Sequence, residues 1–171
     1  MRTPRRRWHE RVTELAVTAS LLGSALVAGV FFAFSSFIMG ALARLPAAEG
    51  IAAMQSINVV VLNRSFLALF MGTAALSLVV AVLAVLAWEA SSAPWYLAGA
   101  LCYLAGTFAV TGLGNVPLND RLAVVAGEPP VAVPVWEHYL ARWTRLNTLR
   151  TAAAAAAALA LVVGLVQEAG I

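Results

Sequence analysis

Four long stretches of this 171-residue chain are almost free of charged side chains, and no other feature restricts its fold as strongly. They lie at about residues 12–39, 64–88, 94–113 and 147–167. A membrane-spanning helix needs about 20 apolar residues to cross a hydrocarbon core of about 30 Å. The sequence therefore predicts four transmembrane helices, in one membrane domain that covers residues 1–171.

The composition excludes most other classes of protein. Hydrophobic residues make up 62% of the chain and charged residues only 11%, whereas a soluble domain has about 45–50% and about 25%. A disordered chain is polar and highly charged, so disorder is excluded as well. We predict an all-α integral membrane four-helix bundle whose main partner is the lipid bilayer.

The basic residues are all arginines, and five of the eleven lie at positions 2, 5, 6, 7 and 11. An arginine cluster before the first apolar stretch suits anionic lipid head groups and retention in the cytoplasm, and does not indicate nucleic acid. That stretch exceeds the about 7–15 residues of a signal peptide core, which favours an uncleaved anchor. Four spans then predict that both termini face the cytoplasm of a bacterial inner membrane, with the connections near 40–63 and 114–147 on the opposite face.

The sequence also indicates where the third predicted helix ends and where the fourth begins. Gly114 to Pro117 predicts the end of the third helix, because proline disrupts a helix interior. The last apolar run, Thr151 to Val166, is too short to span the membrane alone. Residues 135–150 contain no proline or glycine and are predicted to extend the fourth helix beyond the bilayer.

The scarce polar residues gather on the face opposite the termini, mostly at helix ends. They are Gln55, Asn58, Asn63, Arg64, Asn115, Asn119, Asp120, Asn147 and Arg150. An unpaired polar group near hydrocarbon costs several kcal/mol, so these side chains need partners. One interpretation is that they cap helix ends and bond to each other. The other is that they line a pocket between the helix ends.

The segment 135–150 bears on this choice. At 100° per residue, one helix face carries Trp136, Tyr139, Leu140, Trp143, Asn147 and Arg150. The opposite face carries His138, Arg142 and Arg145. An aromatic stripe is more often packing than a ligand site, but an amide and a guanidinium do not belong in apolar packing. An arginine this close to the membrane either extends its side chain to the interface or pairs inward, and for inward pairing we predict Asp120 as the partner of Arg150.

The sequence predicts neither a metal nor a cofactor. Of its two histidines, His9 and His138 lie on opposite sides of the membrane in the four-span arrangement. A di-iron site needs several Glu and His side chains pointing inward, and the predicted spans contain only Glu14. His138 also faces away from the polar stripe, which argues against a Ser-His-Asp triad.

Four segments of the chain resemble the anthrone oxygenase-like membrane proteins. They are residues 31–37 (FFAFSSF), 54–58 (MQSIN), 115–122 (NVPLNDRL), and the W-x6-W-x3-N-x2-R pattern from Trp136 to Arg150. The resemblance covers roughly residues 16–166. It implies a four-helix integral membrane fold. In the characterised fungal members it also implies oxidation of an anthrone to an anthraquinone by molecular oxygen, without an added cofactor.

Such chemistry needs an aromatic slot, donors for a developing enolate oxygen, and a base. We predict Asp120, Asn119 and Arg150 as catalytic residues, with Asp120 as the base, although an ion pair with Arg150 would weaken that base. The predicted substrate-binding residues are Gln55, Asn58, Asn63, Asn115, Trp136, Tyr139, Trp143 and Asn147. The substrate would be a small anthrone-like or quinol-like aromatic.

The alternative is a non-catalytic protein that binds a lipid, a quinone or a partner helix. A transporter is least favoured, since the spans show no inverted repeat. Nothing in the sequence specifies an oligomeric state.

Overall fold

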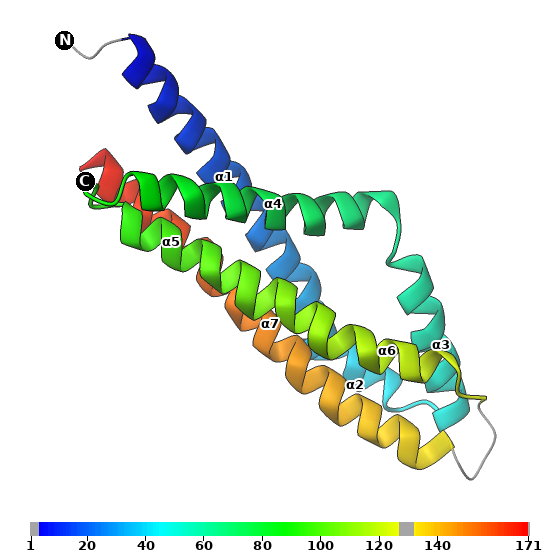
Figure 1. Ribbon diagram of the computed structural model, residues 1–171. Helices are drawn as coiled ribbons and strands as arrows, with labels where there is room; N and C mark the ends of the chain where they lie inside the picture. Colours follow the sequence, from blue (N-terminus) through cyan, green and yellow to red (C-terminus); the bar gives the residue numbers. More distant parts are fainter. Residues whose placement is uncertain (1–3, 127–131, 171) are drawn as a thin grey trace.

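The computed structural model describes residues 4–126 and 132–170, with side chains from residue 11 onward. All regular structure within those ranges is helical (Figure 1). The chain forms α1 (Pro4–Ala33), η1 (Phe34–Ile38), α2 (Met39–Leu42), α3 (Ala47–Val60), α4 (Arg64–Leu86), α5 (Ala93–Leu101), η2 (Cys102–Ala109), η3 (Thr111–Asn115), α6 (Val116–Ala123) and α7 (Ala132–Ala169). The η segments are π-helical turns, which are wider than α turns.

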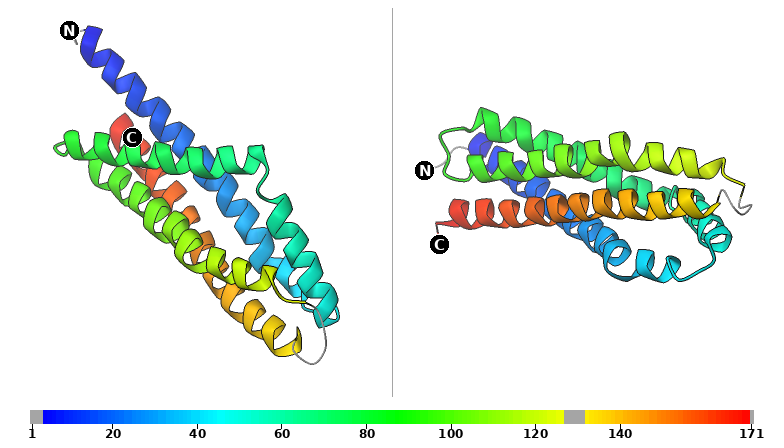
Figure 2. Two further views of the ribbon diagram at one scale, coloured as in Figure 1. Left: turned by 45° about the vertical axis from the view of Figure 1, so that its right-hand side comes forward. Right: turned by 90° about the horizontal axis from the view of Figure 1, so that it is seen from below.

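Within the described residues, four helices are long and apolar enough to cross a membrane, at Arg11–Leu42, Arg64–Leu86, Ala93–Ala123 and Ala132–Ala169. The longest, α7, packs against α1, α5 and η2, while α4 packs against α1 and α5. The start of α1 and the end of α7 lie at one end of the bundle and α3 lies at the other (Figure 2). The all-α membrane bundle predicted from composition is confirmed.

The exposed surface of α7 indicates where the bilayer lies. Glu137, Arg142 and Arg145 are exposed, and the next exposed charged residue is Glu168. Residues 146–166 rise about 30 Å, which is the thickness of a hydrocarbon core. The part of α7 before residue 146 carries the exposed charges, and α3 and α6 pack against it at this end of the bundle. We call this part of α7, with α3 and α6, the cap. The 135–150 segment is part of one continuous α7, as predicted.

The third spanning helix does not end at Gly114–Pro117, contrary to the prediction. It continues through η3 and α6 to Ala123. The N–H of Val116 donates to the carbonyl of Thr111, five residues back, so the turn before Pro117 is widened. Pro117 then falls in the first turn of α6, where a proline ring is tolerated. This continuation carries Asn115 and Asn119 along α7.

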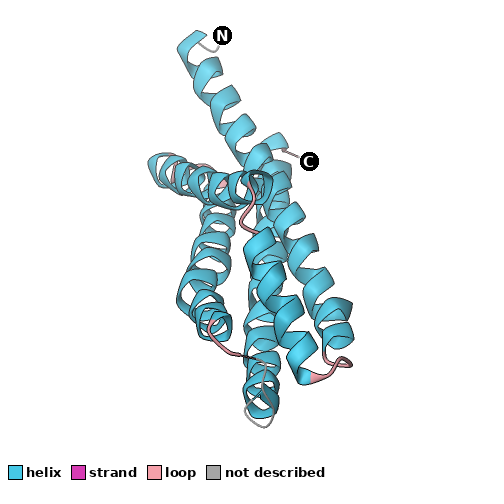
Figure 3. Cartoon of the chain, turned by 90° about the vertical axis from the view of Figure 1, so that its right-hand side faces the viewer, coloured by secondary structure: helices cyan, strands magenta, loops and turns pink. Residues whose placement is uncertain are grey.

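The 40–63 connection, treated as a loop in the sequence, contains the helix α3. Its buried residues Gly50, Ile51 and Met54 face α7, and Figure 1 shows α3 at the end of the bundle away from the start of α1. Figure 3 shows the described chain as helices joined by short loops. A β-carbon at Gly50 would lie 2.7 Å from the Trp136 indole. Glycine therefore lets α3 pack directly on that ring.

Candidate functional site

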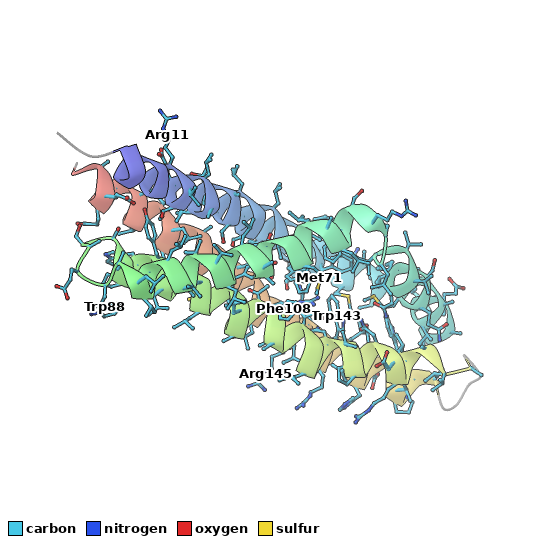
Figure 4. The ribbon with its side chains drawn as sticks, turned by 45° about the horizontal axis from the view of Figure 1, so that its top comes forward. Arg11, Met71, Trp88, Phe108, Trp143 and Arg145 are labelled. Atoms are coloured by element: carbon cyan, nitrogen blue, oxygen red, sulfur yellow. The ribbon has the colours of Figure 1, made fainter. Side chains whose placement is uncertain are left out.

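The polar and aromatic stripe predicted on the last helix is the buried face of α7. Trp136, Tyr139, Trp143, Asn147 and Arg150 are all buried there. His138, Arg142 and Arg145 are exposed on the other side. In Figure 4, Trp143 lies inside the bundle and Arg145 projects outward from it. The helical period thus separates a solvated face from a face that forms the candidate site.

Arg150 is the most unusual residue of this face, because its side chain is only 5% exposed. Its Nε and Nη2 donate to Asn147 Oδ1 at 3.0 and 2.8 Å, and its Nη1 donates to Thr111 Oγ1 at 3.2 Å. The guanidinium carbon lies 3.8 Å from the Phe31 ring centre and 5.0 Å from that of Trp143. Aromatic faces attract a cation but do not neutralise it.

The positive charge therefore has no carboxylate partner within the described structure. A guanidinium has five N–H donors, and the three hydrogen bonds of Arg150 use three of them. A buried charge without a counter-charge is costly, and inside a membrane protein it usually marks a functional site. We call Phe31, Ser35, Thr111, Trp143, Asn147 and Arg150 the Arg150 cluster.

Asn147 fixes the orientation of the cluster. Its Nδ2 donates to the Phe31 carbonyl at 2.7 Å and to Ser35 Oγ at 2.6 Å, so its Oδ1 faces Arg150. Ser35 Oγ is also 3.0 Å from Thr148 Oγ1. These bonds join the end of α1 and η1 to the middle of α7. The amide thus positions the guanidinium and links it to a hydroxyl pair.

Asn119 organises the aromatic residues beside the cluster. Its Oδ1 accepts from Tyr139 OH at 2.8 Å and from Trp143 Nε1 at 2.9 Å. The Tyr139 ring stacks on Trp136 at 5.7 Å and on Trp143 at 6.3 Å between centroids. One amide oxygen therefore satisfies two buried donors and holds three rings in a row.

Several buried polar atoms at this end of the bundle have no hydrogen-bond partner in the described protein. They are Asn58 Nδ2, Asn115 Oδ1 and Trp136 Nε1. The other end of the Asn115 amide, Nδ2, donates to the Trp143 carbonyl at 3.3 Å. An unpaired buried donor or acceptor costs about 1–3 kcal/mol. These atoms offer two donors and one acceptor to a polar ligand.

The pairing predicted between Asp120 and Arg150 is wrong. Asp120 is exposed, whereas its neighbour Asn119 bonds to the buried aromatic rings. Successive side chains on a helix point about 100° apart, so these two residues cannot both face α7. Arg150 bonds to uncharged groups instead.

Two predicted binding residues act as helix caps. Gln55 Nε2 donates to the carbonyls of Leu122 at 2.8 Å and Val125 at 3.2 Å, at the end of α6. Asn63 is exposed, and its Oδ1 accepts from the Phe66 N–H at 3.0 Å at the start of α4. The capping interpretation holds for this pair, while Asn115, Asn119 and Asn147 turn into the bundle.

Sequence reasoning missed three residues of the Arg150 cluster. Phe31 and Ser35 lie four residues apart in the segment 31–37 that carries the family resemblance, which is a signal that points to them. Thr111 lies in a π turn, where the α-helical period does not apply.

Among the described residues, no three His, Cys, Asp or Glu side chains come together as metal ligands. The side chain of His9 lies outside the described set.

An open groove runs along the outer side of the cluster, with a volume of about 490 Å³. It lies between η1–α2 and α7. Its lining residues are Ser35, Met39, Gly40, Ala43, Leu140, Ala141, Thr144, Arg145 and Thr148. Ser35 belongs both to this groove and to the Arg150 cluster.

The fold and the cluster together define a helical membrane protein with a buried cation among aromatic rings. The chain belongs to the anthrone oxygenase family, because the sequence model of that family matches residues 61–160. The matched part runs from the start of α4 into α7 and includes Thr111, Asn115, Asn119 and Arg150. The comparison with curated proteins finds no match. No solved structure matches the chain either.

Proposed function

We propose that this protein is a membrane oxygenase that binds an anthrone-like or quinol-like aromatic beside Arg150 and oxidises it with molecular oxygen, without a cofactor. The observation that carries the proposal is the buried guanidinium, which has no carboxylate partner in the described structure and lies between two aromatic rings. Membership of the anthrone oxygenase family supports the same chemistry.

The cluster suits the enolate of such a substrate. A fused-ring ketone loses a C–H proton to give an enolate, whose negative charge lies on oxygen. A fixed cation in an apolar site stabilises that charge far more than water does, because the local dielectric constant is low. Arg150 would therefore lower the pKa of the substrate and hold its oxygen through the N–H donors not used by Asn147 and Thr111.

The reaction balances with oxygen as the only co-reactant. The enolate passes electrons to O₂, and a carbon–oxygen bond forms to give a hydroperoxide. Loss of the second hydrogen on that carbon as a proton breaks the O–O bond and releases water. An anthrone and O₂ thus become an anthraquinone and H₂O. The protein supplies the fixed positive charge that favours the enolate.

Asp120 has no role in this proposal. Its side chain is exposed on α6, and a catalytic base must come within hydrogen-bond reach of the proton it removes. The first proton instead passes to water, since the charge of Arg150 makes the substrate more acidic. Asn119, Tyr139 and Trp143 form the wall beside the bound ring system.

Oxygen uptake by purified protein tests the proposal. We expect wild-type protein in detergent or nanodiscs to consume O₂ with an anthrone faster than the spontaneous reaction, and to release the anthraquinone. Arg150→Gln should reduce this to the spontaneous rate. No acceleration with anthrones, phenols or quinols would refute the proposal for this protein.

A second candidate function is the binding of a quinone or lipid without turnover. It is favoured by one observation, that the Arg150 cluster contains no carboxylate or histidine to act as a base. Mass spectrometry of a co-purified ligand that Trp143→Ala releases, in protein with no measurable turnover, would support this candidate over the oxygenase.

We further infer that both chain ends face the cytoplasm of a bacterial inner membrane. The arginines at positions 2, 5, 6, 7 and 11 support this orientation through the positive-inside rule. The cap formed by α3, α6 and the first part of α7 would then lie toward the opposite face.

A further inference from the structure

The groove between η1–α2 and α7 lies directly outside the Arg150 cluster. Three of its lining residues are small, namely Gly40, Ala43 and Ala141. Three others carry hydroxyl groups, namely Ser35, Thr144 and Thr148. Arg145 is the charged lining residue and is exposed. It is also the last exposed charge on α7 before the stretch 146–166. The groove therefore lies where the hydrocarbon core meets the cap.

A short chain of hydrogen bonds joins the groove to the buried cation. Thr148 Oγ1 is 3.0 Å from Ser35 Oγ, and Ser35 Oγ accepts from Asn147 Nδ2 at 2.6 Å. The other end of the Asn147 amide, Oδ1, accepts from Arg150. A ligand oxygen that reaches the hydroxyl pair is thus one side chain away from the guanidinium.

Resting on the proposed function, we propose that this groove is the lateral port through which a lipophilic, oxygen-bearing aromatic leaves the bilayer and reaches Arg150. Its ring system lies over Gly40, Ala43 and Ala141, and its oxygen first meets Ser35 and Thr148. The hydrogen bond between Ser35 and Asn147 then opens to admit it to the cluster.

The shape and position of the groove favour this occupant. Its volume of about 490 Å³ lies within the range of about 300–1,000 Å³ for small-molecule sites. A fused-ring ketone or phenol is concentrated in the bilayer, so a route that opens at the membrane boundary supplies it directly. The exposed positive charge of Arg145 at the same place attracts the oxygen end of the ligand.

Filling the groove tests the port. A β-carbon at Gly40 would meet no atom within 4 Å, so Gly40→Leu can fold and place its side chain in open space beside the port. Gly29 on α1 is exposed, has the same free surroundings and does not line the groove, so Gly29→Leu is the matched control.

With an anthrone as substrate, Gly40→Leu should lower kcat/KM about tenfold or more, because the leucine side chain obstructs the entry of the substrate through the groove. Gly29→Leu should match wild type. Equal kinetics for the two variants, in protein that oxidises the anthrone, would overturn the port and leave the proposed oxygenase standing.

A second measurement does not depend on turnover. In a Cys102→Ser background, Ala141→Cys places a thiol in the groove and Val124→Cys places one on the exposed end of α6. Anthraquinone should slow maleimide labelling at position 141 and not at 124. If no turnover is found, the oxygenase proposal falls, and this protection alone decides the port.

Two results would overturn the port in the labelling experiment. One is equal labelling at position 141 with and without anthraquinone. The other is protection by an anionic phospholipid in the nanodisc with no further protection by anthraquinone, which would make the groove a lipid site instead.

Discussion

The guanidinium carbon of Arg150 lies 3.8 Å from the centre of the Phe31 ring, and the two residues come from different spanning helices. This contact replaces the carboxylate that usually accompanies a buried arginine. The Phe31 carbonyl also accepts from Asn147, the residue that holds Arg150. One turn of α1 thus positions the cation through both the ring and the carbonyl of Phe31, and no carboxylate of the described residues pairs with it.

The first prediction concerns the coupling of Asn147 and Arg150. Asn147→Leu should destabilise the protein by about 3–5 kcal/mol, because the buried guanidinium loses the acceptor of two hydrogen bonds. The double variant Asn147→Leu/Arg150→Met should unfold at a higher temperature than Asn147→Leu alone, since it removes the stranded charge. Thermal unfolding in detergent measures both. Additive losses would contradict this account of the pair.

The second prediction separates Arg150 from Asp120 in catalysis. Arg150→Lys keeps the charge but not the planar fork that bonds Asn147 and Thr111, so kcat/KM for an anthrone should fall about 100-fold. Asp120→Asn, which alters an exposed side chain, should stay within about twofold of wild type. Oxygen uptake measures both. A large loss in Asp120→Asn would return that carboxylate to the site.

The third prediction concerns Asn119 Oδ1, which accepts hydrogen bonds from both Tyr139 and Trp143. Asn119→Leu should lower the free energy of unfolding by about 2–4 kcal/mol, because the buried donors of Tyr139 and Trp143 both lose their acceptor. Asn119→Asp keeps an acceptor and is the matched control. Thermal unfolding measures the loss of stability in both variants. A smaller loss in the leucine variant than in the aspartate variant would argue against this role.

The fourth prediction tests the packing of α3 on α7. Gly50→Ala should destabilise the protein by about 1–3 kcal/mol, since its β-carbon would lie 2.7 Å from the Trp136 ring. Gly29→Ala, which would meet no neighbouring atom, should leave stability unchanged or raise it slightly, because alanine favours a helix. An unchanged unfolding temperature of Gly50→Ala would show that α3 can shift away from the Trp136 ring without loss of stability.

The fifth prediction concerns orientation. In a Cys102→Ser background, a cysteine at Val124 should react with a membrane-impermeant maleimide added to intact cells. A cysteine at Ser91, in the turn at the end that holds both chain termini, should react only after the cells are opened. The reverse pattern would place the termini outside the cytoplasm.

The helical membrane fold follows from composition and hydropathy alone, because a bilayer allows few alternatives. The buried face of α7 is equally predictable, since Trp136, Tyr139, Trp143, Asn147 and Arg150 follow the regular α-helical period. A continuous α-helix repeats every 3.6 residues, so the sequence spacing gives the face directly.

The partners of that face are less predictable from the sequence. The spacing of α7 places Arg150 inside, but it does not say that Phe31 and Asn147 surround it in place of Asp120. Those contacts depend on how α1 and η1 cross α7. The helix α3 was also missed, because its 14 residues are too few to span a membrane and its apolar residues do not follow one helix face.

The π-helical winding of the third span has a consequence for how this protein tolerates change. Thr107, Thr111, Asn115 and Asn119 recur every four residues, and all four bond toward α7. Four residues overshoot an α turn of 3.6, so in a regular helix this column would drift around the axis. Wider π turns offset the drift. A deletion of one residue in this span would therefore rotate the polar groups beyond the deletion away from α7, while its length and hydropathy hardly changed.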